Sequence, residues 1–404
     1  MLKDWIWLTT RKGLGPRGVL QVLDYFGTPE RAFYAGPEQY DQIDGLSFMA
    51  RSALKEKGQE GTDRILGECD RLGIRIMTLH DGNYPERLKE IPDPPAVLYI
   101  RGNQFRFDQE AAIGIVGTRT PSPYGEKVAA QLGLDLARNG VLLISGIAQG
   151  IDSIALKGAL QGGGRVVSIL GGGVDVPYPW QNRHLYEERA APGALISEYP
   201  PGTPPAGEHF PVRNRIISGL SLGVVAVECA RRSGTMKTIE HAMEQNRDVF
   251  VVPGNIDAPM SEGPNWLLRQ GAQAVTGAQD ILEEYAGRFP QKLSQAAPLS
   301  PEAAQQRLSQ VKSPKVPEES QAKPEVKRES VPKDQQKIRF TDDQLSLLYV
   351  LGDKRKKYTA DELVDLTQIP ARRVLSALTM LQVDGAVQEH PGRRFSSLVD
   401  LEAQ

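Results

Sequence analysis

The sequence has few cysteines and lacks the commonest signatures of metal and nucleotide sites. Its two cysteines, Cys69 and Cys229, lie far apart in 404 residues and form no CxxC pair. This excludes a disulfide framework and a cysteine zinc site, and it fits a reducing cytoplasm. The five histidines show no HExxH or other paired ligand spacing, so we expect no metal. No GxGxxG follows a predicted strand, which argues against a dehydrogenase.

The sequence also lacks an excess of charge and long apolar runs. Its formal net charge is −2, so it has no bulk attraction to DNA or to a membrane surface, and anion binding needs a local patch. No apolar stretch reaches membrane-spanning length, and the first residues do not resemble a signal peptide. We therefore expect a cytoplasmic protein with no membrane partner.

The order of apolar segments predicts four zones. Helical spacing in the first of these, as in Val19, Val22, Leu23 and Phe26, predicts a small helical domain over residues 1–83. Strands and helices then alternate over 84–286, which is typical of a mostly parallel sheet covered by helices on both faces. A segment rich in Pro, Gln, Ser, Lys and Glu predicts a disordered linker over 287–337.

The last zone, residues 338–404, resembles a winged helix. Asp342 to Leu351 reads as a first helix, Thr359 and Glu362 form a capping box for a second, and Ala371 to Asp384 reads as a third. The third helix of this fold commonly enters the major groove of DNA. Acids and bases nearly balance here, so contact with DNA and contact with a protein both remain open. In the N-terminal zone, the glycine turns at 13–15 and 43–46 have two interpretations: they are DNA-binding hairpins or plain connectors between helices.

Glycines at successive strand ends give the strongest sign of a binding site. The predicted strands run over 97–100, 112–116, 141–145, 166–170, 194–197, 224–228 and 249–252. Several end in glycine plus a polar or basic residue, as in Gly117-Thr118-Arg119 and Gly171-Gly172-Gly173. In an open parallel sheet these ends converge on one crevice, where glycine lets backbone N–H groups approach a ligand closely. The crevice therefore suits phosphate.

Three segments at this crevice carry candidate binding groups. Residues 145–152 offer two glycines and Asp152, which is placed to cap the following helix. Residues 210–215 set Phe210 beside two arginines and an amide, the mixture that single-stranded nucleic acid needs; a hydrophobic staple at a helix start is the alternative. Residues 230–238 open a helix with Ser233 and Thr235, a ready anion site with no GxxxxGK[ST] loop, which argues against an ATPase. No segment pairs a nucleophile with a base, so we expect no catalytic residue.

Taken together, these motifs resemble the DNA-processing protein A (DprA/Smf) family over about residues 84–285. The resemblance rests on the segments 117–125, 145–152, 171–182, 197–198, 210–215, 233–235 and 253–265 in unchanged order. It implies an extended Rossmann-like domain flanked by a SAM-like N-terminal domain and a C-terminal winged helix. It also implies a homodimer that binds and protects single-stranded DNA without sequence preference, uses no cofactor, and loads the RecA recombinase during natural transformation.

The resemblance assigns the DNA-binding role by position. The candidate residues are Gly117, Arg119, Ser145, Gly146, Gly150, Gly172, Phe210, Arg213, Asn214, Arg215, Ser233, Gly234, Thr235 and Lys237. Two positions depart from the family pattern: Leu156 stands where histidine is frequent, and Lys237 stands where an apolar residue is usual. Lys237 either adds a phosphate contact or solvates its helix.

Two other functions remain as alternatives. Ser233-Gly234-Thr235 with Glu240 partly matches the site of the LOG-type phosphoribohydrolases, which release a base from a nucleoside monophosphate. That family's full set of glycines is missing. The third possibility, a winged-helix regulator, requires preference for a duplex sequence.

Overall fold

The computed structural model describes residues 2–183, 193–293, 329–332, 336, 339–352, 358–390 and 394–401. These fall into two compact units, Met1–Ser313 and Pro314–Gln404. The predicted helical zone and the predicted sheet zone both lie in the first unit. One hydrophobic core joins them, because it contains Trp7 and Leu54 from the former and Val97 and Ile113 from the latter.

The first zone is helical, as its apolar spacing predicts. Its helices are α1 (Leu2–Thr9), α2 (Pro16–Phe26), α3 (Pro29–Tyr34), α4 (Pro37–Asp41), α5 (Phe48–Lys55) and α6 (Glu60–Leu72). On α2 the residues at helical spacing, Val19, Val22, Leu23 and Phe26, are all buried. The two glycine turns connect α1 to α2 and α4 to α5, and each contains a glycine at positive φ.

A nine-stranded sheet follows, with the order β1-β2-β6-β5-β4-β3-β7-β8-β9. The strands are β1 (Arg75–Thr78), β2 (Val97–Gly102), β3 (Ala112–Val116), β4 (Leu142–Ser145), β5 (Val166–Leu170), β6 (Gly193–Ser197), β7 (Gly223–Ala226), β8 (Asp248–Val251) and β9 (Gln273–Ala274). Only β2 is antiparallel to its neighbours, β1 and β6; all other pairs are parallel. This is the mostly parallel, Rossmann-like sheet that the sequence predicts. The predicted strands did not include β1 and β9.

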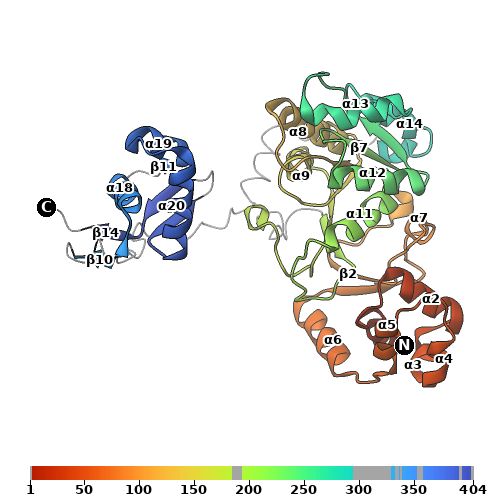
Figure 1. Ribbon diagram of the computed structural model, residues 1–404. Coiled ribbons are helices and arrows are strands. Elements are labelled where there is room, and N and C mark those ends of the chain that lie inside the picture. The colour runs from red at the N-terminus through yellow and green to blue at the C-terminus, as the bar shows by residue number, and fades with distance from the viewer. Residues whose placement is uncertain are drawn as a thin grey trace. The chain divides into compact units, whose positions relative to one another are not determined.

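Helices cover both faces of the sheet (Figure 1). The helices and turns of this region are α7 (Glu86–Lys89), η1 (Phe107–Gln109), α8 (Pro123–Arg138), α9 (Ile151–Gln161), η2 (Trp180–Asn182), α11 (His209–Leu220), α12 (Gly234–Glu244), η3 (Pro259–Ser261), α13 (Glu262–Arg269), α14 (Ala278–Ala286) and α15 (Pro290–Leu293). Residues of α8 and α9 share one core with Ile113 and Leu143, whereas α11 and α12 share the other with Ala112 and Leu142. Alternate residues of a strand point to opposite faces, so each buried strand serves both cores.

The C-terminal unit has its own core and the predicted winged-helix elements. These are α18 (Asp342–Leu351), α19 (Ala360–Thr367), α20 (Ala371–Val383), β10 (Glu329–Val331), β11 (Tyr358–Thr359), β12 (Val387–His390), β13 (Arg394–Ser397) and β14 (Val399–Leu401). The capping box forms as predicted, because Thr359 N donates to Glu362 and Glu362 N donates to the Thr359 hydroxyl. The hairpin of β12 and β13 forms the wing.

The predicted linker, residues 287–337, contains a helix near its start and a strand near its end. Lys292, on α15, forms an ion pair with Glu110 of the sheet unit, at an N–O distance of 3.1 Å. Strand β10 pairs in parallel with β14 of the winged helix. Residues 294–328, the body of the predicted linker, lie outside the described residues. No helix in the described part of the chain is long and apolar enough to cross a membrane.

Candidate functional site

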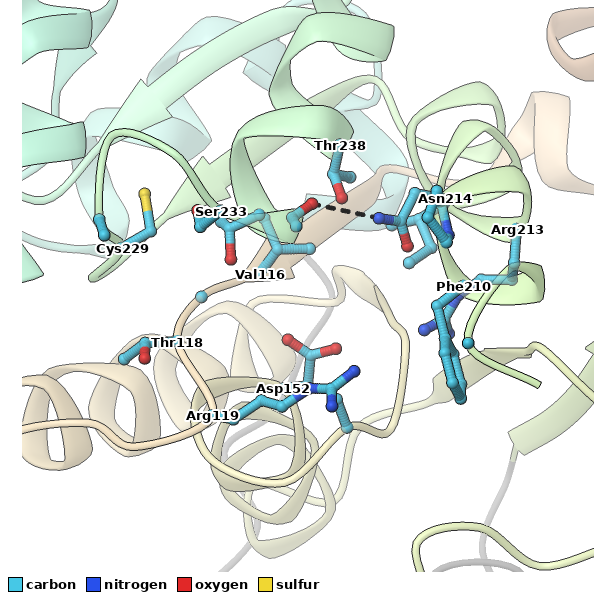
Figure 2. A pocket seen from close by; sticks show the side chains of 18 of the residues that line it. Val116, Thr118, Arg119, Asp152, Phe210, Arg213, Asn214, Cys229, Ser233 and Thr238 are labelled. Atoms are coloured by element: carbon cyan, nitrogen blue, oxygen red, sulfur yellow. Dashed lines mark hydrogen bonds between the residues drawn. The ribbon is translucent and has the colours of Figure 1, made fainter. Parts of the chain in front are cut away.

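A groove of about 630 Å³ lies beyond the carboxyl ends of β3 and β7. Strand β3 is the turning point of the sheet order, with β4 on one side and β7 on the other. Ligands of open α/β sheets bind at such a point, because the connections diverge there and leave a crevice. The lining groups come from the loop after β3, the start of α9, the first turns of α11 and α12, and the segments around Tyr178 and Pro205. Figure 2 shows the first four of these, with Arg119, Asp152, Phe210 and Ser233 labelled.

Two glycines bring the loop after β3 against the start of α9. Gly150 has φ +86°, and a Cβ there would collide with the carbonyl oxygen of Thr118. A Cβ on Gly117 would meet the side chain of Ile151. The N–H of Ile151 donates to Thr118 O at 3.1 Å. These contacts fix the backbone that carries Arg119 at the edge of the groove.

Arg119 is the exposed cation of this edge. It has no ion pair within the described part of the chain, and its guanidinium carbon lies 5.6 Å from the centre of the Phe210 ring. Phe210 in turn stacks on Tyr178, with the ring centres 5.6 Å apart and the planes at 29°. The groove therefore offers an aromatic surface beside a free positive charge. Figure 2 shows Arg119 and Phe210 facing the same space.

Arg213 and Arg215 are placed differently from Arg119, although all three were predicted to neutralise phosphate. Arg213 is 4% exposed, and its guanidinium donates to the carbonyl oxygens of Gly146, at 2.8 Å, and Ile169. Arg215 is also 4% exposed and forms an ion pair with Glu198 at 2.7 Å. Both residues lie on α11, and their guanidinium groups donate to different segments, because Arg215 also donates to Asp93 O at 2.8 Å. Both guanidinium groups therefore have partners within the protein, and of the two residues only Arg213 lines the groove.

The sequence predicts that Asp152 caps α9, and this prediction is wrong. Gly150 is the N-cap residue, and Asp152 instead accepts a hydrogen bond from the N–H of Gly146 at 3.1 Å. Burial raises the pKa of Asp152, while the nearby Arg213 and the N–H of Gly146 oppose that rise. The carboxyl group therefore stabilises the loop after β4 on the floor of the groove.

The sequence predicts an anion site at the first turn of α12. Ser233 is its N-cap, and its hydroxyl accepts from Met236 N at 3.4 Å. Asn214 Nδ2 donates to Gly234 O at 3.2 Å, which ties α11 to this turn (Figure 2). The N–H groups at the start of a helix have no intrahelical acceptors and carry its positive dipole end. They suit a phosphate oxygen, together with the hydroxyl of Thr235.

The cysteine and the two glutamates at or near the groove are buried or have hydrogen-bond partners. Burial raises the pKa of Cys229 to about 12, so this groove-lining thiol stays protonated. The two strand-end glutamates have structural partners: Glu198 binds Arg215, and Glu228 accepts from the N–H and hydroxyl of Ser122. Within the described ranges no group of three or more His, Cys, Asp or Glu side chains is placed to hold a metal ion.

The structure brings most of the predicted binding residues together. Those that line the groove are Gly117, Arg119, Phe210, Arg213, Asn214, Ser233, Gly234 and Thr235. Gly146 and Gly172 line a smaller hollow that shares Tyr178, Pro205 and Phe210 with the groove. The remaining four, Ser145, Gly150, Arg215 and Lys237, lie behind or beside it: Ser145 is fully buried and donates to Ile115 O, and Lys237 pairs with Glu240 on the exposed side of α12.

Sequence reasoning missed several lining residues. Thr118, Tyr178, Pro205, Thr238 and Met260 also face the groove. Thr118 and Tyr178 stand within the motifs that carry the family resemblance, and their place in those motifs is the signal that could have identified them. Met260 comes from η3, far along the chain, and no local pattern marks it.

Comparison with known proteins agrees with this architecture. Residues 75–286 match the family model described as DNA recombination-mediator protein A, and residues 331–393 match the DprA winged helix domain. Protein Smf of Synechocystis is 30% identical over 97% of both chains. The crystal structure of DNA processing protein A from Streptococcus pneumoniae is 33% identical and covers 70% of this chain and 97% of its own, with a TM-score of 0.62.

A second solved structure, of DNA processing protein A from Helicobacter pylori, is described for its single-stranded DNA binding mode. It is 30% identical and covers 53% of this chain and 100% of its own, with a TM-score of 0.47. The order of the motifs, the sheet with its switch point and the two matched domain models lead to one conclusion. The chain belongs to the DprA/Smf family of DNA-processing proteins.

Proposed function

We propose that the groove binds single-stranded DNA without sequence preference, and that the chain does so as a homodimer without catalysing a reaction. The observation that carries the proposal is the juxtaposition of Arg119, the Phe210–Tyr178 stack and the first turn of α12 around one groove. The cation and the N–H groups of the helix suit the phosphates of the DNA, and the aromatic rings offer a surface on which its bases stack. All bases have such a face, so stacking does not select a sequence.

The proposed role in the cell is supported by the match to the family model described as DNA recombination-mediator protein A. A protein that binds single-stranded DNA through the backbone of the DNA leaves the edges of the bases free. A recombinase can then pair these bases. We propose that this chain protects incoming DNA and loads RecA on it during natural transformation and recombination. RecA filament assembly on protein-coated DNA, compared between the wild type and a variant with a disabled groove, tests this step separately from binding.

Arg119→Ala is the direct test of the groove. It removes the exposed cation and one phosphate contact, so we expect binding to a thymidine oligonucleotide to weaken by about tenfold and the salt dependence of log K to fall by about 0.7. Arg64→Ala, on the exposed side of α6, is the matched control and is expected to bind as the wild type does. Titration at several salt concentrations measures both quantities. Equal affinity for Arg119→Ala and the wild type would reject the groove as the DNA site.

The enzymatic alternative finds little support in the geometry. Its proposed glutamate, Glu240, lies on the exposed side of α12, in an ion pair with Lys237 at 2.7 Å, and does not line the groove. Incubation with nucleoside monophosphates is expected to release no free base. Competition among single-stranded DNA, duplex DNA and nucleotides for the chain separates this alternative, and a winged-helix regulator, from the proposed function.

A further inference from the structure

Trp180 stands just outside the groove with most of its side chain in solvent. It opens the short turn η2, two residues after Tyr178 of the ring stack, and it is 65% exposed. A tryptophan is one of the most costly residues to leave in water, because its large apolar surface gains much from burial. Single exposed apolar residues are common, however, so exposure alone carries no conclusion. What distinguishes Trp180 is the way its turn is held in place and the side chains that surround it.

The turn that carries Trp180 is fixed to the wall of the groove. Asn182, 4% exposed, donates from Nδ2 to Ile147 O at 2.9 Å, in the loop after β4. On the other side of Trp180, Tyr178 is held by its stack on Phe210. Both anchors sit within two residues of the indole. A side chain held in this way loses little conformational freedom when a ligand packs on it, which favours binding.

Aromatic rings and arginines continue in one series from the groove to this turn. Arg119 lies over Phe210, Phe210 stacks on Tyr178, and Arg183 lies over Trp180 with its guanidinium carbon 4.5 Å from the ring centre. Two residues of chain span at most about 7 Å, so the Cα atom of Trp180 lies within about 7 Å of that of Tyr178. A row of rings with a cation at each end is the kind of surface on which successive bases of a single strand stack.

We propose that Trp180 is a second stacking platform, on which a base of the single-stranded DNA packs after the strand leaves the groove. This inference rests on the proposed function of the groove and extends it to a residue that the sequence motifs did not single out. The ligand is a nucleotide base of any identity, because an indole offers a face and no hydrogen-bond pattern. Arg183 adds positive charge near the same nucleotide. The platform lengthens the stretch of strand that one chain binds.

Trp180→Ala, Trp180→Phe and the matched control Tyr34→Ala test the platform in the full chain. Tyr34, on α3, is 77% exposed and lies in the helical N-terminal zone. With a series of thymidine oligonucleotides of increasing length, we expect Trp180→Ala to bind the longer ones about five- to tenfold more weakly and the shortest ones as the wild type does. Trp180→Phe keeps a ring and is expected to retain most of the affinity. Tyr34→Ala is expected to match the wild type at every length.

Tryptophan fluorescence gives a readout of direct contact. Of the four tryptophans, Trp5 and Trp7 are buried and Trp266 is half-buried, so we expect most of the quenching by DNA to disappear in Trp180→Phe. An oligonucleotide carrying iododeoxyuridine is expected to cross-link to the peptide that contains Trp180. Unchanged affinity of Trp180→Ala, together with quenching that persists in Trp180→Phe, overturns the platform. If the platform alone is wrong, Arg119→Ala still weakens binding; if the wild type binds no single-stranded DNA, the proposed function itself fails.

Discussion

Three arginines that look equivalent in the sequence have different surroundings. Arg119 is exposed at the edge of the groove, whereas Arg213 and Arg215 are nearly buried on α11. A guanidinium group has five N–H donors in a planar fork, so a buried one can hold several backbone carbonyls at once. Arg213 does this for Gly146 and Ile169, at the ends of β4 and β5. It therefore holds the loop after β4 against β5.

Arg213→Ala is therefore expected to destabilise the fold. The change leaves two buried carbonyls without this donor and removes a positive charge that favours the ionised form of buried Asp152, which together cost about 3 kcal/mol or more in the free energy of unfolding. Urea denaturation followed by circular dichroism measures it. Arg119→Ala, at an exposed position, is the matched control and is expected to change stability by less than about 0.5 kcal/mol. An Arg213→Ala variant as stable as the wild type would mean that its hydrogen bonds contribute nothing.

At the scale of elements, α8 and α9 approach each other through glycine. A Cβ at Gly133 would collide with the carbonyl oxygen of Ala155, and a Cβ at Gly158 would collide with that of Ala130. The two helices therefore pack backbone against backbone. This close packing also sets the position of the first turn of α9, where Asp152 lines the groove.

Gly158→Ala tests this packing. We expect it to separate the helices, to lower the free energy of unfolding by about 1–3 kcal/mol and to weaken DNA binding, because the start of α9 moves with the helix. Gly67→Ala is the control, since nothing lies within 4 Å of a Cβ at this position of α6. There the better helix propensity of alanine is expected to stabilise by up to about 1 kcal/mol. Thermal unfolding and oligonucleotide titration of both variants check these signs, and equal effects at the two positions would contradict the packing.

At the scale of the whole molecule, the groove and the winged helix belong to different units. Every residue that lines the groove lies within Met1–Ser313, and the winged helix has a separate core. A chain that ends at Ser313 is therefore expected to fold and to bind single-stranded oligonucleotides with the affinity of the full chain. Melting and titration of the truncated chain measure both. A large loss of affinity in a folded, truncated chain would show that the winged helix takes part in binding.

The sequence alone determined the class of fold and the family. Buried parallel strands are continuous apolar runs, so those of β3 and β5 could be read with their bounds. Capping is equally local, which is why Thr359 and Glu362 marked the start of α19. Strand β1 was missed because it is short and mostly half-exposed or exposed, and such an edge strand has a weak apolar pattern. Its pairing with β2 is a long-range choice that local sequence does not encode.

Tertiary structure decided which of the candidate residues face the groove. Arg213 and Arg215 lie two positions apart on one helix, so their side chains point to different sides of it. The packing of α11 turns the side with Arg213 toward the groove, whereas Arg215 pairs with Glu198. Thr238 and Met260 joined the groove through the packing of α12 and η3. Residue type and spacing determine what a side chain is able to bind. Its partners across the fold, which come from distant parts of the chain, determine whether it remains available to a ligand.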